Sequence, residues 1–404
     1  MSIFGTELEA IHFPLLGNSV AVGLFSLLHI VLAALSVAFM LMAPVFEFRG
    51  RTNPFDRDLA FGLTRFTIVV FSVSTVLAVI MVELMIGLFP VTTMWMWNHF
   101  RVPIVFGILA FILQLFALYP YYHFWEPLRD YSMRFHMALG TFAAIFMLMW
   151  VVMLDGMGSY MLTPVEGSGP WERLSNPTWL PLSLHRLGGN FMIAGYCIAA
   201  YGAWRAGRPP DHSSHPYYGH LFKTGVAIGL GGLLIQPFTG VLYRVSIHRA
   251  APGTDAVITQ GAYRPMMYVQ FFMLGLLFLG NYLLLRSTRP ARAHTRRFDV
   301  GFPFMVMLML LSVDHAELRR VWLYGLVGLT IWYLITHWRT SFAPIDPSTT
   351  FIRPLALGMG LLSVFLYLTM GTIRETSRRP DTISGKISLE DEVRPQAQFK
   401  GAAR

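Results

Sequence analysis

Uninterrupted apolar runs recur along almost the whole chain, and they restrict its fold more than any other feature. The first run, LFSLLHIVLAALSVAFMLMAP at residues 24–44, contains a single ionisable side chain, His29. A helix needs about 17–25 such residues to cross the hydrocarbon core of a bilayer. With 54% hydrophobic and 13% charged residues among 404, the composition excludes an ordinary soluble domain. The sequence therefore predicts an all-α polytopic membrane protein.

The pattern predicts a bundle of nine or ten transmembrane helices. Residues 300–338 form either a tight helical hairpin or one broken helix, because their first apolar run, of about 14 residues, is short for a span. The expected spans are 19–45, 64–90, 102–120, 135–158, 183–205, 219–244, 262–286, 300–313, 320–338 and 354–373.

Basic residues concentrate in alternate loops, which predicts the orientation. Loops on the cytoplasmic side of a membrane are enriched in Lys and Arg, so the N-terminus should lie outside a bacterial inner membrane. The net charge of +9 then reflects loops that face an anionic leaflet, and a nucleic-acid partner has no support. The basic residues on the expected inner side are Arg49, Arg51, Arg57, Arg65, Arg129, Arg134, Arg205, Arg208, Lys223, Arg286, Arg289, Arg292, Arg296 and Arg297.

Three histidines, His29, His136 and His185, lie within expected spans. An ionisable group in a span indicates a functional site because leaving it unpaired in lipid costs a few kcal/mol. Each of the three faces a strip of small residues. Such a strip permits either close helix contact, with the imidazole hydrogen-bonded between helices, or room for a flat macrocycle. Three such histidines together favour a cofactor.

The absence of other motifs narrows the cofactor. The single cysteine, Cys197, and the lack of CxxCH exclude covalently attached haem c. Copper is not expected because there is no adjacent His-His pair, and zinc is not expected because there is no HExxH or Cys/His cluster. The remaining choice is haem held by histidines on separate helices, with methionine as a possible opposite ligand.

Four stretches in order resemble subunit I of cytochrome bd-type quinol oxidases. They are the first span with His29, HMALGTFAAIFMLMWVVMLDGMGSYMLTP at 136–164, SLHRLGGNFMIAGYCIAAYGAWRAG at 183–207, and AYRPMM at 262–267. The resemblance covers roughly residues 10–290. It implies nine spans, an external N-terminus and an external quinol-binding loop between spans six and seven.

The resemblance also implies ligands for haem b. His185 matches the ligand of the low-spin haem, and Met266 matches the methionine on its other face. Arg264 matches a nearby arginine, for which we expect contact with a haem propionate. His29 resembles the axial ligand of a high-spin haem, so a second haem is possible. His136 matches a histidine associated with proton delivery, and Glu83 resembles a carboxylate on span two; both are expected on a proton path.

Departures from the family limit what the resemblance implies. Span three has Phe106 and Gln114 near the places of two family glutamates and contains no carboxylate. The GRQPW motif is absent, and Asp314, His315 and Glu317 are the nearby polar candidates for replacing its preceding glutamate. The loop at residues 245–263 is too short for the family's quinol-recognition insert. Since apolar side chains cannot relay protons, a working oxygen-reducing haem pair is not favoured.

The leading hypothesis is a haem b-containing electron-transfer subunit of a membrane respiratory complex, passing electrons between quinol or cytochrome c and a partner or a second haem. We expect a second membrane subunit. One alternative is a functional bd-like terminal oxidase. A different class is a non-redox transporter or membrane scaffold, in which the histidines join helices. The expected organisation is a haem-binding bundle of about seven spans at 1–290, further transmembrane helices at 291–373, and a polar tail at 374–404 that is mobile or lies on a partner.

Overall fold

The structure, a computed structural model, describes residues 2–3, 6–7, 13–167, 169–207, 215–261, 263–287, 296–336 and 347–392. The chain forms two compact units. Unit 1 contains residues 1–184, 242–256 and 374–404, and unit 2 contains residues 185–241 and 257–373. The helices are α1 (Asn18–Arg49), α2 (Pro54–Leu88), α3 (Pro90–His123), α4 (Trp125–Tyr160), α5 (Pro170–Leu174), α6 (Trp179–Ala206), α7 (His215–Ala250), α8 (Pro252–Gln260), α9 (Arg264–Ser287), α10 (Arg296–Leu311), α11 (Ala316–Thr336) and α12 (Ile352–Thr376).

Seven of these helices are long and apolar enough to cross a membrane, namely α1, α2, α3, α4, α7, α9 and α12. Among the described residues, the remaining helices are not both long enough and apolar enough by the same criterion. The expected number of nine or ten spans therefore stays a prediction. The all-α polytopic membrane fold is confirmed. Two short antiparallel strand pairs accompany the helices: β1 (Ser2–Ile3) with β2 (Thr6–Glu7), and β3 (Asp381–Ile383) with β4 (Ile387–Ser388).

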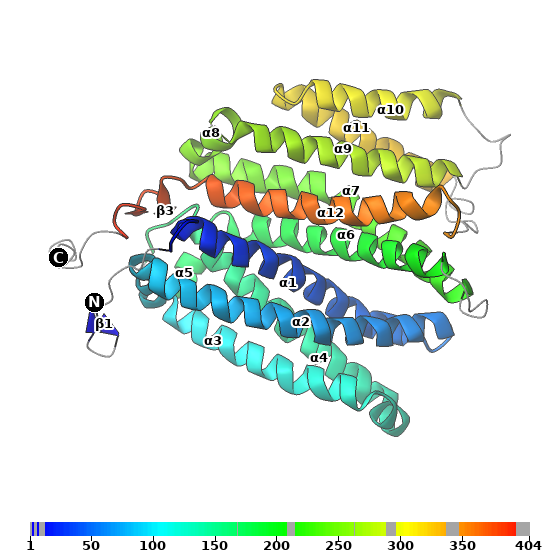
Figure 1. Cartoon of the computed structure of the whole chain (residues 1–404), viewed down its shortest axis with the longest axis horizontal. Helices are drawn as coiled ribbons and strands as arrows, with labels where there is room; N and C mark the ends of the chain where they lie inside the picture. Colours follow the sequence, from blue (N-terminus) through cyan, green and yellow to red (C-terminus); the bar gives the residue numbers. More distant parts are fainter. Residues whose placement is uncertain are drawn as a thin grey trace. The chain divides into compact units, whose positions relative to one another are not determined.

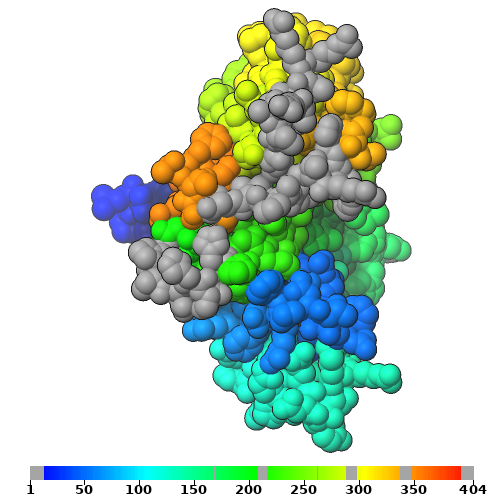
Figure 2. All heavy atoms as spheres, turned by 90° about the vertical axis from the view of Figure 1, so that its right-hand side faces the viewer, coloured from blue at the N-terminus to red at the C-terminus, as the bar shows by residue number. Residues whose placement is uncertain are grey.

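In unit 1, helices α1 to α4 lie side by side (Figure 1), with α1 against α2 and α4, and α3 against α4. The turn from α1 to α2 is tight because a Cβ on Gly50 would lie 2.8 Å from the Arg57 backbone nitrogen. Asn53 then caps α2 by accepting a hydrogen bond from the Phe55 backbone N–H at 3.1 Å. At the same end, Arg57 pairs with Glu126 at 2.8 Å, and Figure 2 shows these two turns next to each other in blue and cyan.

Proline and backbone distortion bend the long helices of unit 1. Phe100 in α3 has non-helical dihedral angles and precedes Pro103, whose ring disturbs the turn before it. Ser132 interrupts α4 in the same way, with φ −161° and ψ 106°. Ser132 therefore divides α4 into a short first segment and a longer second segment, which begins just before His136.

One face of α2 remains exposed and apolar, as expected for a helix that contacts lipid. Only 6% of the most apolar window of this helix is buried. The large exposed side chains recur at helical spacing and are Phe66, Val69, Val73, Val76, Val79 and Val82.

Glycines bring α6 and α7 into backbone contact within unit 2. A Cβ on Gly195 would lie 2.1 Å from the Gly229 nitrogen, and a Cβ on Gly225 would lie 2.3 Å from the Ala199 nitrogen. Neither position has space for a side chain. The small residues of the fifth expected span therefore serve close helix packing here, which was the first of the two alternatives for such strips.

Within the expected region 300–338, the described residues 300–336 form the helical hairpin rather than one broken helix. Helices α10 and α11 pack against each other, with the rings of Phe298 and Tyr333 stacked at 4.8 Å between centroids. A Cβ on Gly325 would lie 2.3 Å from the end of Met305, so this glycine admits the methionine from the opposite helix.

The start of the polar tail is folded. Strands β3 and β4 fold back onto unit 1, where Ile383 and Ile387 are buried against Phe100, Tyr160 and Leu174. The Ser384 N–H donates to the Met161 carbonyl at 2.9 Å. The polar composition concealed two buried isoleucines in the tail, and these hold the hairpin in place. Residues 393–404 lie outside the described residues.

Candidate functional site

His29 lies in α1 and hydrogen-bonds to α2. Its Nδ1 is 2.9 Å from the Ser74 carbonyl oxygen and 3.0 Å from Ser74 Oγ. A carbonyl can only accept, so Nδ1 carries the proton and the lone pair of this tautomer is on Nε2. The interhelical hydrogen bond that the sequence left open is present, and it orients the imidazole between α1 and α2.

His136 is fully buried in a polar cluster of unit 1. Its Nδ1 lies 2.7 Å from Glu47 Oε1, and its Nε2 donates to the Tyr121 carbonyl at 3.0 Å. The Tyr121 hydroxyl donates to Glu47 Oε2 at 2.8 Å, and Arg129 lies 3.8 Å from Glu47 Oε1. Because Nε2 is a donor, the contact between Nδ1 and Glu47 holds one further proton, carried either by the imidazole or by the carboxyl group. This proton makes the cluster a candidate proton-holding site.

Local sequence explains how these groups meet. Gly140 lies one turn after His136 and faces Tyr121, whose ring would be 2.6 Å from a Cβ at this position. The Tyr121 ring stacks on His136 at 4.4 Å, and Trp125 contacts the imidazole edge-on at 4.7 Å. The small strip beside His136 therefore accommodates a tyrosine.

Sequence reasoning missed Glu47, because this residue stands at the end of an apolar run beside arginines and resembles an ordinary loop carboxylate. Glu83, which was expected instead, is exposed on α2 and has no hydrogen bond or ion pair to any described residue. It lies roughly 40 Å from Pro54 along the helix axis at about 1.5 Å per residue. The structure does not bring Glu83 and His136 together.

Gln114 is the other unexpected group in unit 1. It is fully buried, and within the described ranges neither its Oε1 nor its Nε2 has a hydrogen-bond partner. It lies on the same face of α3 as Tyr121, two turns earlier. Phe106, by contrast, is 52% exposed and faces away from the helix contacts. An orphaned buried amide costs about 1–3 kcal/mol, which indicates a site built to hold water or another polar group.

His185 is half-buried in α6 and contacts α7 within unit 2. Its Nδ1 lies 3.1 Å from Thr239 Oγ1, and this hydroxyl donates to a backbone carbonyl of its own helix. Nδ1 and the hydroxyl share a hydrogen bond whose donor depends on the imidazole tautomer. Gln236 Nε2 donates to the His185 carbonyl at 2.7 Å, while the buried Gln236 Oε1 has no partner among the described residues.

The glycines after His185 do not leave open space. A Cβ on Gly188 would lie 2.9 Å from Gln236 Nε2, and one on Gly189 would lie 3.3 Å from the Tyr367 ring. Tyr367 in turn donates to Asn190 Oδ1 at 2.8 Å. On this side of α6, side chains fill the strip that the sequence suggested for a macrocycle.

Met266 and Arg264 begin α9, also in unit 2. Met266 is half-buried. Arg264 and the Tyr268 hydroxyl both donate to Asp314 Oδ1. The hydrogen bonds from Tyr268 and Arg264 lower the pKa of the Asp314 carboxyl below its usual range. Asp314, one of the polar candidates for replacing the missing glutamate, is thus the partner of the arginine that was expected at a propionate.

The imidazoles fit a haem in one respect. An axial histidine usually donates its second ring N–H to a neighbour, which fixes the ring and leaves the other nitrogen for the metal. His29 donates from Nδ1 to a backbone carbonyl and His185 hydrogen-bonds to Thr239 through Nδ1, whereas both ring nitrogens of His136 are engaged within its cluster. The donor set therefore permits His29 and His185 as ligands and disfavours His136.

Comparison with known proteins supports the fold. No protein-family model matches the chain, and no curated protein matches it in sequence. Among solved structures, it is similar to the bd oxidase from Geobacillus thermodenitrificans, with a TM-score of 0.62 and 15% identity over 95% of this chain and 92% of that one. The chain therefore has a bd oxidase-like fold, that of an all-α polytopic membrane protein.

Proposed function

We propose that this chain is a haem b-containing electron-transfer subunit of a membrane respiratory complex, passing electrons between quinol or cytochrome c and a partner subunit or a second haem. The supporting observation is that, in a bd oxidase-like fold, His29 and His185 both lie inside helices and each ring is oriented by a hydrogen bond at Nδ1. A likeness at 15% identity concerns the fold alone, so the function depends on these side chains.

In this proposal His185 and Met266 hold a low-spin haem b and His29 holds a second haem. Bound haem supplies a reversible one-electron centre. Thr239 acts on His185 by keeping its ring orientation and tautomer. Arg264, which donates to Asp314, offers its remaining N–H groups to a propionate. Met as a ligand raises the potential relative to two histidines, which suits an electron acceptor on the outer side.

The Glu47–His136–Tyr121 cluster supplies a proton to this redox chemistry. It stores one exchangeable proton at full burial. Gln114, on the same face of α3, holds a water molecule that continues the hydrogen-bonded path. A glutamine orients water but does not itself carry a proton at neutral pH, so the path is less suited to four-proton oxygen reduction than one with carboxylates.

The non-redox alternative also has an observation in its favour. Gln236 and Tyr367 fill the small-residue face beside His185, as they would in a protein whose histidines only join helices. A reduced-minus-oxidised absorption spectrum of the purified chain distinguishes the two classes. Low-spin haem bands support the proposal, and a colourless preparation from haem-replete cells overturns it.

Substitution assigns the ligands. His185→Ala and His29→Ala should each remove one distinct spectral component, whereas His123→Ala, exposed at the end of α3, should leave the spectrum unchanged. Thr239→Val should keep the haem but broaden or shift the His185 component, because the ring loses its hydrogen bond. An unchanged spectrum in both alanine variants would reject these two residues as ligands.

A further inference from the structure

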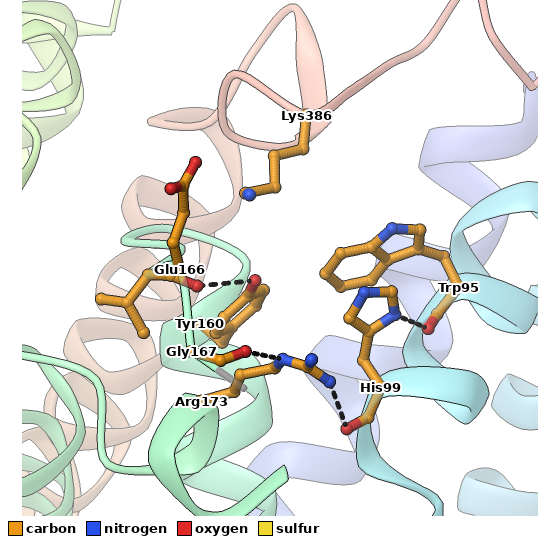
Figure 3. A pocket seen from close by; sticks show the side chains of 8 residues that line it. Trp95, His99, Tyr160, Glu166, Gly167, Arg173 and Lys386 are labelled. Atoms are coloured by element: carbon orange, nitrogen blue, oxygen red, sulfur yellow. Dashed lines mark hydrogen bonds between the residues drawn. The ribbon is translucent and has the colours of Figure 1, made fainter. Parts of the chain in front are cut away.

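A pocket opens in unit 1 where α3 begins and α4 ends. It has a volume of about 430 Å³. Trp95 and His99 of α3 form one wall and Tyr160 and Glu166 form another, with Lys386 from the turn between β3 and β4 above them (Figure 3). We call this the α3–α4 pocket. None of its lining residues is among those proposed above for haem binding or proton transfer.

The β3–β4 hairpin is a fixed wall of this pocket. Ile383 and Ile387, on either side of the turn that carries Lys386, are buried in the cluster that contains Tyr160. The carboxylate of Glu392 accepts the N–H groups of Val91 and Thr92 at 3.0 and 2.9 Å, at the N-terminus of α3. The pocket is therefore incomplete without the C-terminal hairpin.

The aromatic rings of the pocket are already engaged with one another. Trp95 stacks on His99 with centroids 3.4 Å apart, and the Tyr160 ring lies 5.6 Å from Trp95. A planar ligand sandwiched between two rings needs about 7 Å between their centroids. Neither the Trp95–His99 spacing nor the Trp95–Tyr160 spacing admits a third ring. The groups of the pocket that remain available to a ligand are therefore polar.

The polar groups available to a ligand include one positively charged and one negatively charged side chain. Lys386 and Glu166 are both exposed, and neither has an ion pair or a side-chain hydrogen bond to any part of the chain that the structure describes. His99 Nδ1 lies 2.7 Å from the Trp95 carbonyl, so its Nε2 is an acceptor. Arg173 serves the wall itself, since it donates to the carbonyls of Gly167 and His99.

The positions of two aromatic residues in their helices predict that the pocket lies at head-group depth in a bilayer. Trp95 is near the start of one apolar helix and Tyr160 is at the end of another. Trp and Tyr are enriched at this depth, where an apolar body meets a wet edge. A ligand arriving from the membrane therefore presents its head to Lys386 and Glu166.

We propose that the α3–α4 pocket binds the head group of a phospholipid that carries both a phosphate and a primary ammonium. The phosphate accepts from Lys386, and the ammonium donates to Glu166 and to His99 Nε2. A head with negative charge alone is repelled by Glu166, and a trimethylated ammonium has no N–H to donate. This inference does not depend on haem binding.

The test is retention of lipid by the full-length protein, measured by native mass spectrometry after extraction from nanodiscs. The probes are phosphatidylethanolamine, phosphatidylcholine and phosphatidylglycerol with the same acyl chains, together with soluble phosphoethanolamine as competitor. We expect the ethanolamine lipid to be retained most. Lys386→Gln should reduce its occupancy by up to about fivefold, the upper limit for an exposed ion pair.

Glu166→Gln should reverse the preference toward the anionic glycerol lipid, because the cation of the pocket then acts alone. Lys223→Gln, which removes the charge of a lysine in α7, is the matched control and should change nothing. Equal retention of the choline lipid by the wild type would overturn the proposal. So would stronger retention of the glycerol lipid, displacement by a short-chain quinol, or equally tight binding of soluble phosphoethanolamine.

Discussion

At the scale of single residues, the most constrained group is Glu47. Its two oxygens serve His136 and Tyr121, and all three side chains are fully buried. A buried carboxylate is tolerated only when its lone pairs are satisfied and a proton or counter-charge is present. The cluster meets both conditions through the imidazole and Arg129, so each member depends on the others.

Glu47→Ala should lower the free energy of unfolding by about 3 kcal/mol, because it leaves a buried imidazole nitrogen and a buried hydroxyl without partners. Glu47→Gln should lower it by no more than about 1 kcal/mol, since the amide accepts from Tyr121 and donates to neutral His136. The measurement is denaturant unfolding of the purified protein in detergent. Glu126→Ala, which breaks the exposed pair with Arg57, is the control and should cost less than about 1 kcal/mol. Equal losses for the three variants would contradict this account of the cluster.

The sequence pattern predicted which histidines lie within membrane spans, but it did not predict the side chains that surround them. His29, His136 and His185 stand out because apolar neighbours isolate them. Glu47 does not, since its contact with His136 joins positions 89 residues apart, and no local rule connects them. Glu83 was expected because it resembles a family carboxylate on span two, yet it lies on an exposed face of α2.

At the scale of elements, glycine governs how unit 2 packs. The approach of α6 and α7 is limited by backbone atoms rather than by side chains. Apolar run length predicted these helices well. The ends of helices were predicted less accurately. Helices α1 to α4 extend beyond the apolar runs into polar turns, where caps and prolines set their ends.

Gly225→Ala should lower the free energy of unfolding by about 2–3 kcal/mol, because the added Cβ meets the Ala199 backbone nitrogen at 2.3 Å and the two helices must separate. Gly231→Ala lies on the same helix with nothing within 4 Å of the added Cβ. This control should be neutral or raise stability by up to about 1 kcal/mol through helix propensity. The measurement is the denaturant midpoint of unfolding for each variant. Similar midpoints for Gly225→Ala and Gly231→Ala would show that the helices do not pack through Gly225.

The C-terminal hairpin should respond to pH through Glu392. Burial raises the pKa of this carboxyl above its usual range, and this effect exceeds the opposing hydrogen bonds from Thr92 and Val91. A raised pKa in the folded state means that stability is fully present below the unfolded pKa of about 4.3 and is lost as the pH rises through the folded pKa. Hydrogen-exchange protection of residues 381–388, corrected for intrinsic rates, should therefore fall as the pH rises above about 4.3. Glu392→Gln should flatten this dependence, and protection that increases with pH would contradict the sign.

At the scale of the whole molecule, a bd oxidase-like fold persists at 15% identity because its requirements are simple. Helices must be long enough to span, internally hydrogen-bonded and free of unpaired charge. Many sequences satisfy these rules, so the fold follows from the apolar pattern while the site does not.

Orientation in the membrane is the remaining property of the whole chain that charge predicts. The α1–α2 turn and the first part of α4 carry Arg49, Arg51, Arg57, Arg129 and Arg134, which the positive-inside rule assigns to the cytoplasm. Because Cys197 is the only cysteine, Cys197→Ser gives a background for single-cysteine labelling. In intact spheroplasts, a membrane-impermeant maleimide should label Glu166→Cys and Lys386→Cys at once, but Thr52→Cys only after permeabilisation. The reverse pattern would place the N-terminus inside, and the α3–α4 pocket would then face the cytoplasmic leaflet.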